Sequence, residues 1–323
     1  MKFFKKTRDY IAQHGFSSFF YVAKLMLLRI RRIVTPRGHV VRRVNDSYKM
    51  YLDISDTGIS QALYLYGTRE KDQVYIVQNV LKRGMKVLDI GANIGYYVLL
   101  EAGIIGDSGR IYAFEPHLDN VNILKKNIEL NGFSDRIELS QRGISDKDGT
   151  MEFFVSPKSN LHTLNPSFFK PTKTARFNGS IKIDVVDIKR VLREKSPIDF
   201  VRMDVEGHEV EVLGGLCEAL EYMKVFPSIL FETHFPRYDD IKHDMRSVLR
   251  GLFERGYKVE AIVSNDESKG LLRKAGYRPK KVLKTDLVHR GIYRNINTDD
   301  ALRFICDTGG IRAVFLKNEK ATI

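Results

Sequence analysis

Short apolar runs alternate with segments of helical periodicity from Lys86 onward, and this alternation is the main indication of the fold. Runs of a length suited to strands occur at Val87–Ile90, Ile111–Phe114, Ile137–Leu139, Ile198–Met203 and Ser228–Phe231. Such alternation is typical of βαβ units, in which helices cover a mostly parallel sheet. The pattern therefore predicts one α/β domain over residues 83–323. Ligands of such folds bind outside the carboxyl ends of the strands.

Residues 37–82 show a different pattern and are predicted to form an extension of this domain. Val40–Val44 and Tyr48–Ile54 flank the turn-like cluster Asn45-Asp46-Ser47, which indicates a β-hairpin. Two short helices are expected to follow, at Ile59–Tyr66 and Lys71–Leu81.

Residues 1–36 are predicted to form a basic amphipathic helical arm. Charged residues interrupt the apolar stretch Phe16–Val34 before it reaches the roughly 18 uncharged residues of a spanning helix. No small-residue cleavage site follows, so no secretory signal is predicted. At about 100° per residue one side carries Lys24, Arg31 and Arg32, whereas Phe19, Phe20, Leu27 and Ile30 lie largely elsewhere. Two interpretations stay open: peripheral contact with an anionic membrane, or packing on the main domain with a solvated basic face.

Composition limits the compartment and the partners. The chain has 323 residues, 43% of them hydrophobic, and only two distant cysteines, which suits a globular protein of a reducing compartment. We therefore expect a cytoplasmic protein; peripheral contact at the cytoplasmic membrane face follows only from the first of the two interpretations of the arm. Residues 1–43 carry +10 and residues 268–294 carry +8 of the net +13, leaving −5 for the rest. A body-wide groove for phosphates is not indicated, and no nucleic acid partner is expected.

A glycine turn after the first strand of the α/β domain indicates a cofactor site. Asp89 lies near the end of that strand, and Gly91-Ala-Asn93-Ile-Gly95 leads into a helix through Tyr97 and Leu100. Glycine permits a sharp bend and a close approach to a ligand. A dinucleotide site also has glycine at the middle position, where this chain has Asn93. S-adenosylmethionine has no pyrophosphate and does not impose that approach, and Asp89 offers an anion to its amino group.

An acidic residue follows twenty positions after Gly95, in Ala113-Phe114-Glu115-Pro116. This place at the end of the second strand is where a carboxylate can accept both ribose hydroxyls. Pro116 then prevents the strand from continuing. The turn and Glu115 together favour a nucleotide-type cofactor far more than the glycines alone.

With these motifs the sequence resembles the FkbM-type methyltransferases, a class I family that uses S-adenosylmethionine, often on hydroxyls of sugars or natural products. The likeness extends roughly over residues 48–235 and rests on Tyr66-Gly-Thr-Arg-Glu70, Val87–Gly95, Phe114-Glu-Pro116, Gly143-Ile-Ser-Asp146 with Gly149, and Ile198–Gly207. Arg202-Met203 and His208 depart from the family pattern, which bears on the substrate.

The resemblance implies a Rossmann-like class I methyltransferase fold with a mostly parallel seven-stranded sheet and helices on both faces. It places Ile144 and Ser145 near the adenine. The residues expected to bind the cofactor are then Glu70, Asp89, Gly91, Asn93, Gly95, Glu115, Pro116, Ile144, Ser145 and Asp204.

Candidate catalytic groups follow the fourth and fifth strands, where Asp204 and Glu206, then Glu232 and His234, would face the transferred methyl. An alcohol is a poor nucleophile until its proton is removed, and these side chains are candidate bases. We expect Asp204 and Glu206 to position or deprotonate the acceptor, assisted by Glu232 and His234. Two acids and a histidine are common without a metal, so a divalent cation is considered but not predicted.

Neighbouring polar residues allow structural interpretations. Glu209 and Glu211 are expected to cap or solubilise the next helix, and His208 is left open. A long polar connection between Val155 and Ile181 is typical of a lid. Its residues Asn160, His162, Phe168, Phe169 and Phe177 are candidates either for sugar contact or for surface packing.

The predicted function is an S-adenosylmethionine-dependent O-methyltransferase that acts on a hydroxyl of a sugar, glycan or glycolipid. Asp204-Val-Glu-Gly207 stands where many N-methyltransferases carry an Asn/Asp-Pro-Pro-aromatic turn, which favours oxygen as the acceptor. The alternatives are a methyltransferase of a small natural product or of nucleic acid, and an NAD-dependent oxidoreductase, which Asn93 disfavours.

Overall fold

The computed structural model describes residues 17–35, 38–166, 177–235, 238, 241 and 243–318, with side chains from Val22 onward. The chain forms two compact units, residues 1–69 and 70–323. Helix α4 (Lys71–Val80) belongs to the larger unit and contacts α5 and strands β12 and β13. This helix was predicted to belong to the extension that ends at residue 82. The apolar pattern of a helix does not show which part of the chain the helix packs against.

The smaller unit contains the predicted hairpin and its following helix. Strands β1 (His39–Val44) and β2 (Tyr48–Asp53) pair antiparallel, and α3 (Ile59–Tyr66) packs on them. Asn45 and Asp46 have φ of 50° and 55°, which allows the tight turn between the strands. The alternation along β2 buries Met50 and Leu52 beside α3. The hairpin and this helix are as predicted.

The arm helix α2 (Ser17–Val34) has an exposed side and a side that contacts the rest of the smaller unit. Leu28 is buried, Lys24 Nζ donates to the Leu65 carbonyl, and Arg32 donates to the carbonyls of Ile54 and Asp56. Two of the three cations expected to form a solvated basic side are thus bound within the unit. The exposed side carries Met26, Leu27, Ile30, Ile33 and Val34. Among the described helices, none is long and apolar enough to cross a membrane.

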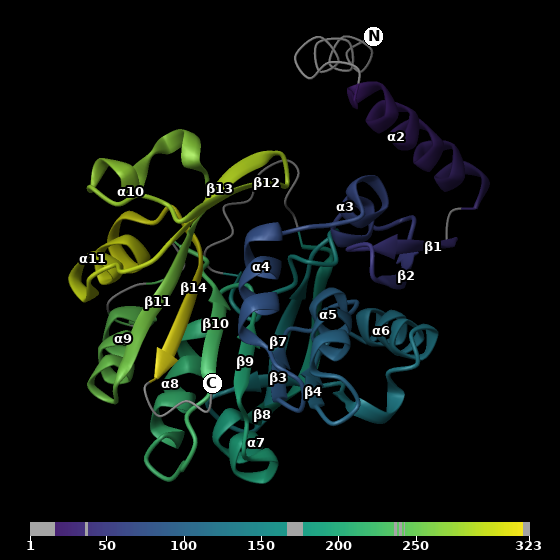
Figure 1. The fold of residues 1–323 in the computed structure, drawn as a ribbon. Helices are drawn as coiled ribbons and strands as arrows, with labels where there is room; N and C mark the ends of the chain where they lie inside the picture. The colour runs from purple at the N-terminus through teal and green to yellow at the C-terminus, as the bar shows by residue number, and fades with distance from the viewer. Residues whose placement is uncertain are drawn as a thin grey trace. The chain divides into compact units, whose positions relative to one another are not determined.

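The larger unit is built from a large sheet, a small sheet and covering helices (Figure 1). Its strands are β3 (Lys86–Ile90), β4 (Arg110–Phe114), β5 (Ile137–Ser140), β6 (Gly143–Ser145), β7 (Gly149–Val155), β8 (Gly179–Asp187), β9 (Phe200–Met203), β10 (Ser228–Glu232), β11 (Tyr257–Ser264), β12 (Lys281–Thr285), β13 (Val288–Tyr293) and β14 (Ile311–Asn318). Besides α4, its helices are α5 (Tyr96–Ile105), α6 (Leu118–Leu130), α7 (Ile188–Lys195), α8 (Glu209–Ala219), α9 (Met245–Glu254), α10 (Leu271–Lys274) and α11 (Thr298–Leu302). Short helical turns are η1 (Ser134–Arg136), η3 (Glu267–Lys269) and η4 (Arg303–Thr308).

Within the described residues the large sheet has the strand order β12-β13-β11-β14-β10-β9-β3-β4-β5. The five strands from β10 to β5 are parallel, and all five strands predicted from the apolar runs lie among them. Strand β14 runs antiparallel between β10 and β11. The α/β prediction is confirmed, but the sheet has nine strands where seven were predicted, because the antiparallel hairpin β12–β13 extends it beyond β11.

A second sheet of order β6-β8-β7 flanks the polar connection between Val155 and Ile181, and only the end of β7 and the start of β8 fall within it. Strands β7 and β8 pair antiparallel from Gly149 to Val155, so the two ends of that connection are regular structure. Its apolar positions Phe153, Ile183 and Val185 form a small core of their own. This sheet was missed because its exposed strands carry weak apolar alternation.

Alternation along the central strands separates the apolar core from the polar site. Leu88 and Ile90 of β3, Val201 and Met203 of β9, and Phe231 of β10 join the core formed with α7, α8 and α9. Because successive side chains of a strand point to opposite faces, Asp89, Arg202 and Glu232 all point to the other face. Helix α5 packs beside β3 and β4. Three charged side chains therefore lie along three neighbouring strands, near the carboxyl ends.

Candidate active site

The turn after β3 needs glycine at Gly91. This residue has φ of +83°, and a Cβ built on it would lie 2.0 Å from the carbonyl oxygen of Asp204. Gly95, with φ of +94°, precedes α5, and a Cβ there would meet the side chain of Leu124. Asn93 between them has φ of +49°, a conformation that asparagine tolerates better than most residues. The bend thus brings the backbone of the turn against the end of β9.

Glu115 holds the middle of this turn from the end of the neighbouring strand. Its Oε2 accepts a hydrogen bond from the Asn93 backbone N–H at 2.9 Å. Its Oε1 accepts from the His117 backbone N–H at 2.9 Å and from Asn120 Nδ2 at 3.1 Å. Burial raises the pKa of Glu115 to about 7, although these donors favour the charged form. Pro116 follows it, just before α6. Binding of ribose by Glu115 stays a prediction.

Part of the long polar connection lies against the same turn. Asn93 Nδ2 donates to the carbonyl of Ser159 at 3.0 Å. The buried His162 ring lies 4.4 Å from that of His117, and burial lowers the pKa of His162 to about 4. Asn160 is half-buried, and the ring of Phe177 packs 5.5 Å from Phe154. Phe168 and Phe169 lie outside the described residues.

Arg202 links Asp89, beside the glycine turn, to the candidate catalytic residue Asp204. No role was predicted for Arg202 from the sequence. Its Nη1 lies 3.7 Å from Asp89 Oδ1, and its Nη2 donates to Asp204 Oδ2 at 3.2 Å. Its guanidinium group also lies over the ring of Tyr97, 4.1 Å from the centroid. Burial raises the pKa of Asp89 to about 6, and Arg202 opposes this shift. A basic residue two positions before the strand-end acid Asp204 was the available signal.

Asp204, Glu206, Glu232 and His234 converge at the ends of β9 and β10. His234 Nε2 lies 3.4 Å from Glu206 Oε2, 3.4 Å from Glu232 Oε1 and 3.8 Å from Asp204 Oδ1. Glu206 has φ of +51°, and a turn at this point brings both carboxylates to the imidazole. The four side chains predicted to be catalytic thus form one cluster.

Glu209 orients His234 and was expected to cap or solubilise α8. Its side chain is fully buried, and Oε1 accepts a hydrogen bond from His234 Nδ1 at 2.7 Å. A carboxylate can only accept, so Nδ1 carries a proton, and Nε2 is the ring nitrogen that faces the cluster. Burial opposes a charge on His234, but the carboxylates of Glu206 and Glu209 raise its pKa well above the usual range. Glu209 was overlooked because the first turn of a helix is usually solvated.

A second buried network brings Glu70 close to the cluster. Arg312 of β14 pairs with both Glu70 and Glu232. Glu70 Oε2 also accepts a hydrogen bond from the Tyr97 hydroxyl at 3.0 Å, and Gln73 Nε2 donates to Glu232 Oε2 at 3.2 Å. Glu70 has φ of +45°, a strained conformation of the kind often found at functional sites. Arg312 was missed because it lies far along the chain from every recognised motif.

Ile144 and Ser145 lie apart from this cluster. Ile144 packs in the apolar core, and Ser145 Oγ hydrogen-bonds to His208 Nε2 at 2.9 Å. His208 is buried and 3.4 Å from Glu211, so it joins β6 to the start of α8. The contact of Ile144 and Ser145 with an adenine stays a prediction.

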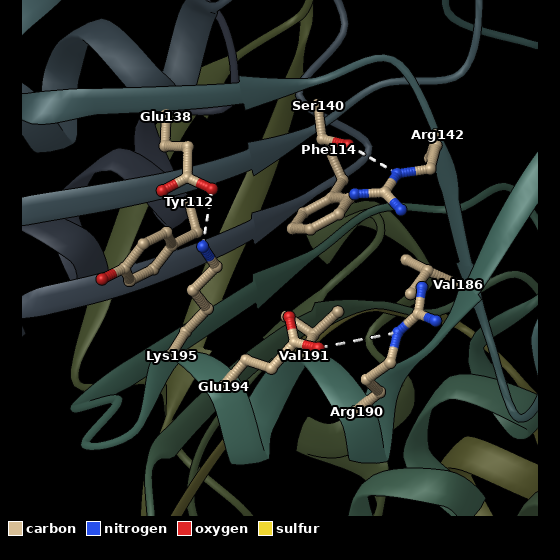
Figure 2. Close-up of a pocket in the computed structure, with 10 residues that line it drawn as sticks. All are labelled: Tyr112, Phe114, Glu138, Ser140, Arg142, Val186, Arg190, Val191, Glu194 and Lys195. Atoms are coloured by element: carbon tan, nitrogen blue, oxygen red, sulfur yellow. Dashed lines mark hydrogen bonds and ion pairs between the residues drawn. The ribbon is translucent and has the colours of Figure 1, made fainter.

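A pocket of about 240 Å³ lies between the β4–β5 edge of the large sheet and α7 (Figure 2). Charged side chains surround it, and Figure 2 shows Lys195 paired with Glu138 and Arg190 paired with Glu194. Arg190 also pairs with Asp148. Because most of its charges are neutralised by neighbours, we assign this pocket no role in catalysis.

The topology and the site define a methyltransferase, and comparison with known proteins agrees. The model of the methyltransferase FkbM domain matches residues 89–259, more than half of the chain. The chain belongs to the FkbM methyltransferase family.

Two curated relatives are methyltransferases. Methyltransferase sdnD of Sordaria araneosa is 31% identical over 202 residues, which cover 54% of this chain and 76% of that protein. The hexuronic acid methyltransferase AglP of Haloferax volcanii is 27% identical over 171 residues, covering 51% of this chain and 62% of that protein.

Solved structures give weaker likenesses. An S-adenosylmethionine-dependent O-methyltransferase of Thermotoga maritima matches with a TM-score of 0.39 and 15% identity, covering 89% of this chain and 80% of the other. An rRNA methylase of Streptococcus thermophilus matches with a TM-score of 0.37 and 11% identity, covering 76% and 94%. Likenesses of this degree do not indicate a substrate.

Proposed function

We propose that this methyltransferase uses S-adenosylmethionine to methylate a hydroxyl group of a sugar, glycan or glycolipid. The observation that carries the proposal is the convergence of Asp204, Glu206, Glu232 and His234 beside the glycine turn. Hydroxyl methylation requires an acceptor aligned with the methyl group and a base for its proton. A cluster of bases at the strand ends, next to the cofactor turn, meets both requirements.

The turn and Glu115 suit the cofactor. Gly91 and Gly95 carry no side chain at the two ends of the turn, and Glu115 is buried with both oxygens directed by donors of the turn and the start of α6. Asp89 is buried with Arg202 3.7 Å away, and neither of its oxygens accepts a hydrogen bond, so a cationic amino group would be a suitable further partner. When bound, S-adenosylmethionine supplies a methyl carbon made electrophilic by its sulfonium. Asp89 and Glu115 would bind its two ends.

The residues of the cluster supply the rest of the reaction. The acceptor hydroxyl loses its proton to this cluster while its oxygen is directed toward the methyl carbon. Glu209 and Arg202 act on the cluster from behind: Glu209 fixes the imidazole of His234, and Arg202 fixes the carboxylate of Asp204. The buried position keeps water from competing with the acceptor.

An oxygen acceptor is favoured over a nitrogen acceptor for two reasons. The site offers several bases, and Asp204-Val-Glu-Gly207 stands where many N-methyltransferases have an Asn/Asp-Pro-Pro-aromatic turn. The name of the Haloferax relative supports a sugar as the acceptor. The alternatives are a small natural product or nucleic acid as the substrate, and NAD-dependent oxidoreduction as the activity. The following experiment distinguishes them from the proposal.

Binding and transfer are measured separately. Calorimetry with S-adenosylhomocysteine, using NAD as the competitor, tests the cofactor. Transfer of labelled methyl into glycan, lipid and RNA fractions of host extract tests the acceptor, with Asp204→Asn as the impaired variant and Glu138→Gln of the sheet edge as the matched control. We expect label in glycan or glycolipid that Asp204→Asn abolishes. Preference for NAD, or label confined to RNA, would contradict the proposal.

We also propose that α2 contacts an anionic membrane surface, but through its exposed apolar side. Met26, Leu27, Ile30, Ile33 and Val34 form a stripe at helical spacing, and the exposed Arg29 and Arg31 lie among them in sequence. Apolar residues entering the headgroup boundary beside arginines suit anionic lipid.

A further inference from the structure

The cluster has an excess of negative charge for a buried site. Asp204, Glu206, Glu209, Glu232 and Glu70 contribute five carboxylates, whereas Arg202 and Arg312 contribute two guanidinium groups. Buried carboxylates are costly unless cations or donors compensate them. A protonated His234 would leave the group negative. A further positive charge would therefore stabilise the carboxylates of this site.

Two atoms in the cluster lack a hydrogen-bond partner although both are buried. They are His234 Nε2, on a side chain that is only 10% exposed, and Asp204 Oδ1. Both point toward the same place, 3.8 Å apart, and one oxygen of Glu232 completes a set of three donor atoms within 4.8 Å of one another. Donors that share one metal ion lie about 3–4 Å apart, since metal–ligand distances are about 2.0–2.2 Å.

The environment of His234 is that of a metal-binding imidazole. Its Nδ1 donates to Glu209 at 2.7 Å, so Nε2 is the nitrogen that faces the carboxylates, and a bound cation would take the place of an Nε2 proton. A carboxylate behind a ligating histidine fixes the ring and increases its basicity. Glu232 is also held by neighbours: Arg312 Nη1 pairs with Oε1, the oxygen that faces His234, and Gln73 Nε2 donates to Oε2.

From this geometry we infer that Asp204, Glu232 and His234 bind a divalent cation that also binds the acceptor hydroxyl. The inference rests on the proposed function and adds a cofactor to it. Two carboxylates and one imidazole favour a first-row transition cation such as Mn²⁺ or Zn²⁺ over Ca²⁺, which prefers oxygen ligands alone.

The cation changes how the acceptor proton leaves. An oxygen bound to a divalent cation has a lowered pKa, so its O–H bond breaks more readily. The proton passes to Glu206, whose Oε2 lies 3.4 Å from the ligating imidazole nitrogen. The acceptor oxygen then forms its bond to the methyl carbon as the carbon–sulfur bond breaks. Glu206 becomes the base, and Asp204 and His234 become metal ligands.

Mn²⁺ binding to the chelator-treated full-length protein tests this inference directly. Electron paramagnetic resonance titration should show one tightly bound Mn²⁺ per chain that Zn²⁺ displaces and Ca²⁺ does not. Asp204→Asn and His234→Gln should abolish it, whereas Glu209→Gln should weaken it about tenfold, the effect expected for a residue behind a ligand. Glu138→Gln, which removes an exposed carboxylate paired with Lys195, should bind Mn²⁺ normally.

Further measurements separate failure of this inference from failure of the proposed function. Circular dichroism confirms that each variant is folded, and S-adenosylhomocysteine binding should survive chelation. Anomalous scattering from crystals grown with Mn²⁺ should show the ion between Asp204, Glu232 and His234. Mn²⁺ binding that persists in both ligand variants, or an anomalous peak elsewhere, would overturn the site. Chelated protein with full methyl transfer would overturn the role in catalysis while leaving the O-methyltransferase proposal intact.

Discussion

Arg202 and Asp89 face each other across the parallel strands β9 and β3, with Nη1 and Oδ1 3.7 Å apart and both side chains buried. The two residues are direct partners in the strand register, and Arg202 reaches on to Asp204 and to the carbonyl of Gly91. One guanidinium group thus joins the glycine turn after β3 to the acidic cluster at the ends of β9 and β10.

Arg202→Met should therefore destabilise the fold strongly. It leaves Asp89 and Asp204 without their cation, and removing one partner of a buried ion pair costs about 3–5 kcal/mol. Urea unfolding followed by circular dichroism measures this, because the chain has no tryptophan. Arg190→Gln breaks a half-exposed pair with Asp148 and should stay within about 1 kcal/mol of wild type. Equal effects of the two substitutions would contradict the central role of Arg202.

Gly91→Ala should damage both cofactor binding and stability. The backbone conformation alone costs about 1–3 kcal/mol for a residue with a Cβ, and the Cβ would also clash with the Asp204 carbonyl oxygen at 2.0 Å. Gly103→Ala is the matched control, since a Cβ there meets nothing within 4 Å on α5. That control should be neutral or stabilising by up to about 1 kcal/mol. Calorimetry with S-adenosylhomocysteine and urea unfolding of both variants check the contrast.

Glu115→Gln should weaken S-adenosylhomocysteine binding about 10- to 100-fold, because hydrogen bonds to a charged group contribute about 1.5–3 kcal/mol. It also places an amide among the three donors that now converge on the carboxylate. Glu138→Gln at the end of the sheet should bind the ligand as wild type does. Unchanged affinity of Glu115→Gln would remove Glu115 from the cofactor site.

The raised pKa of Glu115 predicts a pH dependence of binding. Its pKa is about 7 in the folded protein against an ordinary 4.5, so the folded state holds more protons between these values. The contribution of this group to the stability of the ligand-free protein therefore falls as pH rises through that window. Ribose hydroxyls donate best to the ionised carboxylate, so S-adenosylhomocysteine affinity should rise about tenfold from pH 6 to pH 8. The calorimetric profile of Glu115→Gln should lack this component; identical profiles would contradict it.

Charging the exposed side of α2 should release the protein from membranes. Leu27 and Ile30 are 46% and 57% exposed, and Leu27→Glu with Ile30→Glu places two anions on this side. Co-sedimentation with phosphatidylglycerol vesicles should fall at least about tenfold. Each substitution removes an apolar side chain that would enter the membrane and adds a carboxylate that the anionic lipid repels. Leu118→Glu, at a residue 51% exposed on α6, is the control. Equal sedimentation of both proteins would exclude α2 as the contact.

The sequence alone determined the fold class, the five parallel strands and the cofactor turn. Those features depend on local patterns: apolar runs of strand length, glycines where a Cβ cannot be accommodated, and an acid at a fixed distance from the turn. The hairpin of the smaller unit was equally local, because Asn45-Asp46-Ser47 lies between two strand-forming runs.

Only the tertiary structure decided how the site is assembled. Arg312 reaches Glu70 across 242 positions, and His234 meets Glu209 only because β10 ends where α8 begins, at the same edge of the sheet. Long-range ion pairs leave no periodic trace in a sequence, since they depend on which strands become neighbours. For the same reason Lys24 and Arg32 seemed solvent-facing from their helical positions, whereas carbonyl groups of the smaller unit bind them.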